Sequence, residues 1–543
     1  MATQNSEPND TGSSDQNAGG IGWAGSLVGS KNPNNLGYRY STPSKRYRAA
    51  DSDNDGQREL PTNLQIQLQN RQGEELAETI DVPTGSSVDD LTALLHSLLQ
   101  EAEKDEAKGI PYSFYAQIEK DGARDDVEVT TSLSDLLQTY TTIGTEEVLR
   151  LTYQPLSVFR VRPVSRCTDT LPGHTEAVLH VSYSPDGRML ASGGGDATVR
   201  FWDVFTAMPK FVCKGHKNHV LCTAWSPNAK RFVSADKSGV LIVWDPNKGE
   251  SMGKNIKAHK QWITGIAWEP MHCNKGVCER LATSSKDGTV KIHNVRTHSC
   301  LSTLSGHTDS VEAVRWGGED LLYTASRDRT IKVWNPDRGI LVRTLTGHGH
   351  RINTLALSSD YVLRSGPFDY KQNKFDSAED AYEAACKKYK AFREQQGAER
   401  LVSGSDDFTL FIWNPKESKH PIKRLTGHQQ AVNHIAFSPD GRYFASASFD
   451  KKVKIWNGFS GDFIRTLTGH VGAVYQVAWS GDSRYLVSAS KDSTAKLWEI
   501  PSGKHARETL PGHADEVYAL DWSPNGGSVA TGSKDRTIKI WKH

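Results

Sequence analysis

The sequence lacks the features that mark membrane-spanning and secreted proteins. It has no run of 18 apolar residues, and its first 30 residues are polar and rich in Gly, Ser and Asn. We therefore expect neither a membrane span nor a secretory signal. The seven cysteines are odd in number and show no framework spacing, which favours a reduced intracellular compartment. The formal net charge of +1 gives no global field that would favour nucleic acid or membrane.

Catalytic motifs are also missing. Neither HExxH nor GxSxG occurs, and PSGKH at Pro501 lacks the upstream glycine of a phosphate loop. His272, Cys273 and Cys278 imitate zinc ligands, but no second ligand pair has zinc-finger spacing, so we favour a loop extension. We predict a protein that is not an enzyme, without catalytic residues or a cofactor of its own.

One pattern recurs along most of the 543 residues, most plainly between His470 and Trp498. Successive opening histidines lie 42, 43, 48, 41, 80, 42 and 43 residues apart. A period of about 40–45 residues that opens with Gly-His and closes with Trp indicates a four-stranded propeller blade. The opening histidines are His174, His216, His259, His307, His348, His428, His470 and His513.

Each repeat carries the same polar groups. Seven repeats have an aspartate near the closing residue, and Ser238 replaces this acid in the second. The acids are Asp196, Asp287, Asp328, Asp407, Asp450, Asp492 and Asp535. The preceding hydroxyls are Ser192, Ser234, Thr283, Thr324, Ser403, Ser446, Ser488 and Thr531. The closing residues are Trp202, Trp244, His293, Trp334, Trp413, Trp456, Trp498 and Trp541.

These repeats resemble the WD-repeat family. The resemblance implies that the aspartate bonds the histidine, which bonds the hydroxyl, which bonds the indole. We expect this structural network in every blade, as in the sets His174, Asp196, Trp202 and His470, Asp492, Trp498. A metal or catalytic array of histidines is the less favoured alternative. We predict a mainly β protein whose residues 156–543 form an eight-bladed WD-repeat β-propeller.

Two departures from the repeat carry predictions. Because the chain stops two residues after Trp541, the segment from Val164 to Leu171 should complete blade eight. The 80-residue step in blade five contains an insertion, residues 368–399, whose helix is capped by Ser377 and ended by Gly397. Packing of this helix on its own blade and contact with a partner remain equal alternatives.

The residues before the propeller form two regions. Residues 1–60 lack apolar periodicity and are predicted to be a disordered tail. Its stretch YRYSTPSKRYR, with Arg39, Lys45, Arg46 and Arg48, is a candidate RNA-binding segment or a solvated charge run. Residues 61–155 show strand, strand, helix and further strands, with a capping box at Ser87. This order resembles the small α+β ubiquitin-like, or β-grasp, fold.

A binding surface is expected at one rim of the propeller channel. The position before each inner strand holds Ala177, His219, Trp262, Ser310, Arg351, Ala431, Ala473 and Glu516. His219, Trp262 and Arg351 bring large groups together on blades two, three and five, and Trp and Arg are favoured interface anchors. We predict partner binding there, with a rim that has no partner as the alternative.

The combination of an amino-terminal ubiquitin-like domain, eight repeats and a helical insertion resembles the Notchless family of ribosome assembly factors. The stretches that carry the resemblance are FRVRPVSRCT, WITGIAWEP, ALSSDYVLRSG, LVSGSDDFTLFIWNP and GHADEVYALDWS. The resemblance implies a ribosome biogenesis factor, in the nucleus, nucleolus and nucleoplasm, on precursors of the large ribosomal subunit. The partners implied are the AAA ATPase midasin and the ribosomal proteins, assembly factors and rRNA of the particle.

The resemblance also implies a metal contact in trans. An acid at the loop before the last strand of the ubiquitin-like domain would complete the Mg²⁺ or Mn²⁺ site of midasin, whose ATP-driven force remodels the particle and releases the factor. Glu146, after Gly144 and Thr145, is the candidate, and Glu147 is second. The alternative function is a generic WD-repeat scaffold, or a substrate receptor in ubiquitin-ligase or Notch signalling.

Overall fold

The computed structural model describes most of the chain from residue 61 onward. The described residues are 61–70, 75–76, 79–101, 112–120, 123–129, 132–139, 148–155, 159–371, 373–375, 377–500 and 506–543. None of the described helices is long and apolar enough to cross a membrane. All seven cysteines are free thiols.

The amino-terminal domain is a mixed five-stranded sheet with a helix on it. Its elements are β1 Asn63–Gln69, β2 Ile80–Pro83, α1 Val88–Glu101, β3 Tyr112–Lys120, β4 Ala123–Glu128, α2 Leu133–Thr139 and β5 Leu149–Pro155. The strand order is β2-β1-β5-β3-β4, with β1 parallel to β5 and the other pairs antiparallel. The structure thus shows a small α+β domain, and its identity as a ubiquitin-like module stays a prediction.

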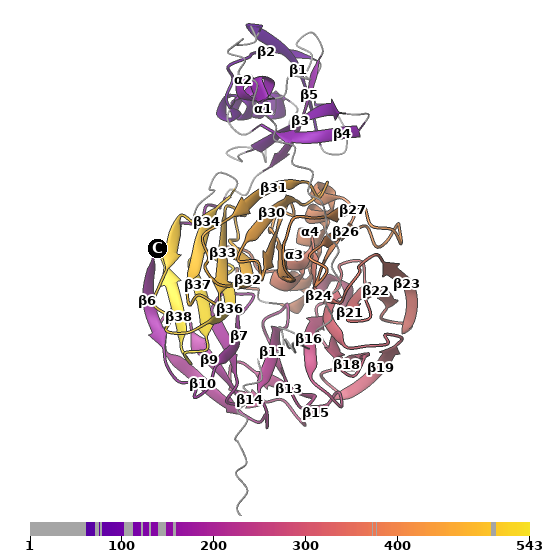
Figure 1. Cartoon of the computed structure of the whole chain (residues 1–543), viewed down its shortest axis with the longest axis vertical. Helices are drawn as coiled ribbons and strands as arrows, with labels where there is room; N and C mark the ends of the chain where they lie inside the picture. Colours follow the sequence, from indigo (N-terminus) through magenta and orange to yellow (C-terminus); the bar gives the residue numbers. More distant parts are fainter. Residues whose placement is uncertain are drawn as a thin grey trace, which may run out of the picture. The chain divides into compact units, whose positions relative to one another are not determined.

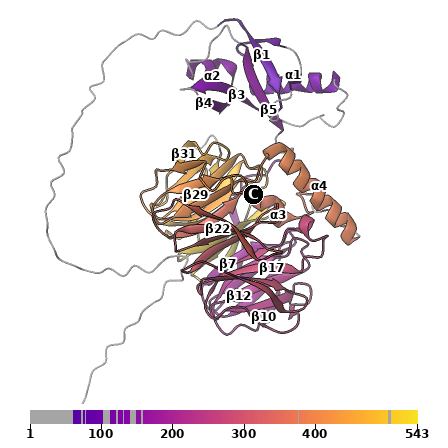
Figure 2. The ribbon, with the colours of Figure 1, turned by 90° about the vertical axis from the view of Figure 1, so that its right-hand side faces the viewer.

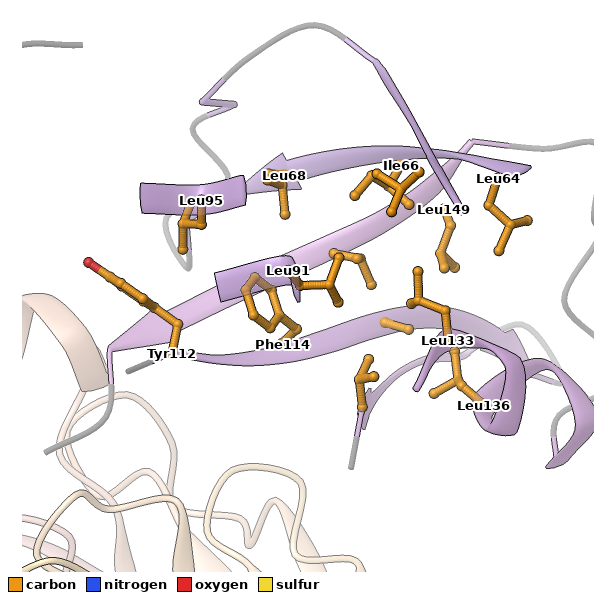
Figure 3. Packing of buried hydrophobic residues seen from close by; sticks show 14 of the residues in the cluster. Leu64, Ile66, Leu68, Leu91, Leu95, Tyr112, Phe114, Leu133, Leu136 and Leu149 are labelled. Atoms are coloured by element: carbon orange, nitrogen blue, oxygen red, sulfur yellow. The ribbon is translucent and has the colours of Figure 1, made fainter. Parts of the chain in front are cut away.

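Local sequence explains these elements. The apolar residues of β1 alternate, so that Leu64, Ile66 and Leu68 face α1 across the core, as Figure 3 shows. The Ser87 amide donates to the Asp90 carboxylate at 2.9 Å, and the Asp90 amide donates to the Ser87 hydroxyl at 3.3 Å. The predicted capping box is confirmed. Strand β4 pairs with β3 from Ala123 onward, where Ala123 lies opposite Lys120.

Eight further sheets form the propeller, with the first strand of each repeat innermost (Figure 1). Blades one to four contain β7 Val178–Tyr183, β8 Met189–Gly194, β9 Thr198–Asp203, β10 Pro209–Lys214; β11 Val220–Trp225, β12 Phe232–Asp236, β13 Val240–Asp245, β14 Glu250–Ser251, β15 Ile256–Lys257; β16 Ile263–Trp268, β17 Arg280–Ser285, β18 Thr289–Asn294, β19 Ser299–Ser305; and β20 Val311–Trp316, β21 Leu322–Ser326, β22 Thr330–Asn335, β23 Ile340–Thr346. The fourth strand of blade two is split into β14 and β15, which both pair with β13.

The other four blades follow the same order. They contain β24 Ile352–Leu357, β25 Leu401–Ser405, β26 Leu410–Trp413, β27 Lys423–Leu425; β28 Val432–Phe437, β29 Tyr443–Ser448, β30 Val453–Asn457, β31 Phe463–Leu467; β32 Val474–Trp479, β33 Tyr485–Ser490, β34 Ala495–Glu499, β35 Glu508–Leu510; and β36 Val517–Trp522, β37 Ser528–Ser533, β38 Ile538–Lys542 with β6 Arg166–Leu171. Second strands such as β33 are buried along their whole length, whereas outer strands such as β19 are mostly exposed. The prediction of eight blades is confirmed.

The ring closes through the strand that precedes blade one. Strand β6 pairs antiparallel with β38, with Leu171 opposite Ile538 and Thr170 opposite Lys539. Val161 and Val164, just before β6, are buried among residues of blades seven and eight. The predicted closure of blade eight by Val164–Leu171 is confirmed.

The insertion in blade five starts earlier than predicted and has two helices. Helix α3 Asp360–Ser365 begins directly after β24, so the boundary at residue 368 was placed too late. The Arg364 guanidinium binds the Asp521 carboxylate of blade eight, and Arg315 lies 3.6 Å from Asp360. Helix α3 thereby lines a cavity of about 370 Å³ at the end of the channel where the inner strands finish.

Helix α4 Ala378–Gln396 runs along the side of the propeller next to α3 (Figure 2). The Asp380 amide donates to the Ser377 hydroxyl at 3.0 Å, and Gly397, at φ +72°, ends the helix as predicted. The His272 ring of the loop between β16 and β17, whose 3₁₀ turn is η2 Met271–Cys273, stacks on Tyr389 at 3.9 Å. The helix therefore packs on α3 and on the loop of blade three, and its Arg393 binds Glu319 of blade four.

Candidate functional site

Blade seven shows the repeated polar network in its regular form. The Trp498 indole N–H donates to the Ser488 hydroxyl at 2.8 Å, and the hydroxyl bonds His470 Nε2 at 2.8 Å. His470 Nδ1 bonds the Asp492 carboxylate, also at 2.8 Å. The second carboxylate oxygen accepts the amide and hydroxyl of Thr494. The same chain from acid through histidine to the closing residue is present in all eight blades, so these histidines hold the blades together.

The network keeps its carboxylates ionised. Burial opposes the charge of Asp492, but the hydrogen bonds from His470, Thr494 and Val471 outweigh it and hold the pKa of this acid well below its ordinary value. The pKa values of Asp196 and Asp236 are lowered in the same way. The ionised acid and the histidine therefore form a fully hydrogen-bonded buried pair, which is a structural arrangement and not a reactive one.

Blade two departs from the prediction. The sequence pattern predicts that Ser238 replaces the acid, but Asp236, two residues earlier, bonds His216 Nδ1 at 3.0 Å. The other oxygen of Asp236 accepts the amide and hydroxyl of Ser238 at 2.9 and 2.8 Å. Comparison of SADKSG in blade two with SASKDS in blade seven shows that Ser and Asp have exchanged places. The exchange can be read from the sequence when Asp236 is considered together with the position of Ser238.

Blade three replaces Trp by His293, as the sequence predicts. His293 Nε2 bonds the Thr283 hydroxyl at 3.1 Å, whereas Nδ1 is buried without a hydrogen-bond partner among the described residues. Burial, together with the nearby His259 and Lys291, lowers the pKa of His293 to about 4, so this ring is neutral at pH 7.

The predicted rim is built from two residues per blade. The carbonyl of the residue before each inner strand accepts the amide of the residue before the turn, as in Lys237 to His219 and Lys286 to Trp262, both at 3.0 Å. Repetition of this bond in the eight blades places the predicted rim residues at equivalent points around the channel. Ser310 is buried there, while Trp262 is half-buried.

The rim has a cationic side. The ammonium groups of Lys237 and Lys286 lie 4.4 and 3.9 Å from the centre of the Trp262 indole ring. Arg351 is bound to Asp406, with 25% of its side chain exposed, so its charge is already compensated. His219 Nδ1 lies 3.9 Å from Glu176 of blade one. The candidate anchors therefore differ: the two lysines over Trp262 form no ion pair with a carboxylate of the described residues, and Arg351 is paired with Asp406.

The opposite side of the rim is aromatic and acidic. The rings of Phe449 and Tyr475 meet edge to face at 6.3 Å, and Tyr475 lies 5.6 Å from Tyr518. The Tyr475 hydroxyl donates to Glu516 at 2.8 Å. Lys491 lies 3.8 Å from the same acid, so the lysine on this side has a carboxylate partner. Sequence reasoning selected Glu516 but missed this aromatic group and the lysines of the cationic side.

The side chains that imitate zinc ligands form hydrogen bonds with the backbone instead. His272 Nε2 bonds the Gly318 carbonyl at 2.7 Å, and the Cys273 thiol also points to this carbonyl at 3.7 Å. Burial raises the pKa of Cys273 to about 12, which disfavours the thiolate that a metal needs. Across the described ranges, no group of three His, Cys, Asp or Glu side chains could hold a metal ion.

Two sets of predicted site residues lie outside the described residues. They are the basic residues Arg39, Lys45, Arg46 and Arg48 of the tail, and the acids Glu146 and Glu147 before β5. Their roles stay predictions from the sequence.

The fold and the rim define a WD-repeat protein with an amino-terminal α+β domain. The WD domain, G-beta repeat family matches residues 165–203, 208–245, 250–294, 298–335, 419–457, 461–499 and 505–542, and the NLE (NUC135) domain matches residues 64–137. The seven matched repeats leave out blade five, which the insertion interrupts. The designed protein Ika8 has a TM-score of 0.54 and 24% identity, over 69% of this chain and 98% of its own, which shows the propeller fold alone.

Relatives identify the family more narrowly. The chain is 50% identical to Notchless protein homolog of Arabidopsis thaliana, over 73% of this chain and 80% of the relative. It is 45% identical to Protein Notchless of Drosophila melanogaster, over 73% and 78%. It is 42% identical to Ribosome assembly protein 4 of Saccharomyces cerevisiae, over 75% and 80%. The chain belongs to the Notchless family.

Proposed function

We propose that this protein is a ribosome biogenesis factor that acts on precursors of the large ribosomal subunit. The observation that carries the proposal is its 42% identity, over 80% of the relative, to a protein named for ribosome assembly. The fold supports it, because a ring of bonded blades with a varied rim suits a scaffold that holds several partners at once. The proposed location is the nucleus, with the nucleolus and nucleoplasm as the sites of work.

We further propose that the amino-terminal domain, as a ubiquitin-like module, docks on the AAA ATPase midasin. Glu146 would give a carboxylate oxygen to the Mg²⁺ or Mn²⁺ held by that partner, because such ions prefer hard oxygen ligands. ATP-driven force would then pass through this domain to the particle and release the factor. The α+β domain has its own buried core, which would let it carry such a load.

Sedimentation of the tagged chain in cell extract tests the particle association. We expect the protein to move with large-subunit precursors and to co-purify their rRNA. A protein found only in the light fractions, free of rRNA and assembly factors, would contradict the proposal and favour a signalling scaffold.

Variants at Glu146 test the link to midasin. Glu146→Ala should abolish Mg²⁺-dependent binding to the isolated metal-site domain of midasin, and Glu146→Asp should weaken it, because the shorter side chain withdraws the oxygen from the ion. Glu147→Ala is the matched control and should bind normally. Equal thermal unfolding of the three variants excludes misfolding. Wild-type, metal-dependent affinity in Glu146→Ala would remove this residue from the mechanism without affecting the particle association.

A further inference from the structure

Four lysines gather on the rim over blades two and three. Lys217 and Lys260 follow the network histidines in the loops GHKNH and AHKQW, and Lys237 and Lys286 occupy the turns of the same blades. Strands β11 and β16 of these blades are neighbours (Figure 1). We call these four residues the basic arc. The two loops contain no acidic residue.

Trp262 organises the centre of the basic arc. Its indole ring lies within 4.4 Å of both the Lys237 and Lys286 ammonium groups, so an aromatic ring, and not a carboxylate, accompanies these charges. Within the part of the chain that the structure describes, none of the four lysines makes an ion pair with a carboxylate. Burial, and then the nearby cations Arg327, Lys237 and Arg351, lower the pKa of Lys286, while Glu312 acts in the opposite direction. An added anion would relieve this crowding of positive charge.

The rest of the rim shows that this arrangement is local. At the equivalent turn positions of blades seven and eight, Lys491 lies 3.8 Å from Glu516 and Lys534 lies 3.4 Å from Asp515. In blade four, Arg327 bonds Glu312 at 2.5 Å. A cation at the equivalent turn position of blades four, seven and eight therefore has a carboxylate partner, whereas Lys237 and Lys286 have none among the described residues; Glu176 and Glu312 lie at the borders of this region.

We propose that the basic arc binds the phosphate backbone of an RNA strand, an assignment that deepens the proposed function by naming the chemistry of one partner. Four ammonium groups over two adjacent blades match an extended polyanion with regularly spaced charges better than a single acidic side chain. Lysine is a point charge suited to phosphate, whereas a planar carboxylate is best held by the two N–H groups of an arginine fork. The arginine beside the arc, Arg327, is already occupied by Glu312.

Trp262 has a positioning role in this proposal. Because both lysines lie against its ring, the indole holds the ammonium groups in place instead of stacking on a base. Recognition should therefore be independent of RNA sequence, since contacts with phosphates carry no base information.

Fluorescence anisotropy of purified full-length protein with a labelled, unpaired RNA of about 20 nucleotides tests the proposal. Since each phosphate contact on a single strand contributes about 0.7 to the salt slope, loss of two contacts in Lys237→Gln/Lys286→Gln should weaken binding about 25-fold at ~0.1 M salt. The slope of log affinity against log salt should fall by about 1.4.

The chain itself provides a matched control. Lys491→Gln/Lys534→Gln removes the same two charges from equivalent rim positions and should leave affinity within about twofold, because those lysines are paired with acids. All measurements are repeated in a chain whose Arg39, Lys45, Arg46 and Arg48 are changed to Gln, so that the tail does not mask the effect. Thermal unfolding should be equal in all variants.

Three outcomes would overturn the proposal. They are absence of RNA binding in the tail-neutralised chain, equal losses in both lysine pairs, and equally tight binding of a polyglutamate peptide of the same charge. The last outcome would assign the basic arc to an acidic protein segment. Because the assay contains no ribosomal particle, each outcome is separable from the sedimentation test of the proposed function.

Discussion

Blade seven and blade three build the same architecture from different residues, and the difference shows which parts of the repeat depend on one another. In blade seven, Gly469 precedes the network histidine and Trp498 closes the blade; in blade three these positions hold Ala258 and His293. A Cβ added to Gly306, the equivalent glycine of blade four, would lie 3.1 Å from the Trp334 ring, which is tighter than an ordinary contact; one added to Gly469 would lie in contact with the Trp498 ring at 3.5 Å. The smaller imidazole leaves room for the methyl group of Ala258.

Blades two and eight also depart from the regular repeat, and in each a second change nearby restores the lost contact. In blade two the acid and the serine exchange places, and the histidine keeps a carboxylate partner. In blade eight the outer strand comes from the segment before blade one, and the sheet keeps four strands. A regular blade therefore specifies a set of contacts, and its residues can change as long as the network histidine keeps its hydrogen-bond partners.

The largest effect on stability is expected at blade eight, because its outer strand, β6, comes from the segment before blade one. Deletion of residues 156–172 removes β6 together with the buried side chains of Val161, Val164 and Leu171, and it leaves the edge of β38 unpaired. We expect a loss of at least about 5 kcal/mol of unfolding free energy, because each buried aliphatic side chain contributes about 1.5–3 kcal/mol. Chemical denaturation of the full chain measures this.

The substitution Leu171→Ala tests the same strand more mildly and should lower the unfolding free energy by about 2–4 kcal/mol. Deletion of residues 1–60 is the control and should leave the propeller transition unchanged. An unaltered transition after the 156–172 deletion would show that the ring does not need its closing strand.

The exchange in blade two offers a sharper test. Asp236→Ser leaves the buried His216 without its carboxylate and should destabilise the protein by about 3 kcal/mol. Asp236→Ser/Ser238→Asp copies the arrangement of blade seven and should recover stability to within about 1 kcal/mol of wild type, since the acid again faces Nδ1. Equal midpoints of denaturation for the single and double variants would show that the two positions do not substitute for each other.

These cases also show how far sequence reasoning reached. Period, strand content and the partners of the network histidines could be predicted because every blade repeats one set of hydrogen bonds. The acid of blade two was missed because a side chain can reach the same histidine from a position two residues away. Helix α3 was missed because its six residues, DYVLRS, carry too little periodicity, and its place depends on Arg364 meeting Asp521 far along the chain.

Some residues of the candidate site could be predicted from the repeat, and others depend on contacts that only the fold creates. The rim positions were predicted by counting from the inner strands, so Trp262 and Arg351 were found. Lys237 and Lys286 were not, because only the folded blades bring the two turns against one indole ring. Compensation of Arg351 by Asp406 also depends on a residue 55 positions away.

The smallest expected effect is in blade three. His293→Trp alone should destabilise the protein by about 1–3 kcal/mol, because the indole would meet the Ala258 methyl group. Ala258→Gly/His293→Trp removes this clash and also removes a buried imidazole nitrogen without a partner, so it should match or exceed wild-type stability. A double-mutant cycle should therefore give a coupling energy of at least about 1 kcal/mol.

The pH dependence separates this explanation from simple repacking. The pKa of His293 is about 4 in the folded protein and about 6.5 in the unfolded chain. Between these two pH values the unfolded chain thus binds a proton that the folded protein does not bind. The unfolding free energy of the wild type therefore falls as pH drops below about 6.5. The double variant lacks this group, so its unfolding free energy should fall less between about pH 7.5 and 5. The network acids do not interfere, because their lowered pKa values place their contribution below pH 4. Parallel stability curves for wild type and the double variant across this range would show that His293 does not titrate as its burial requires.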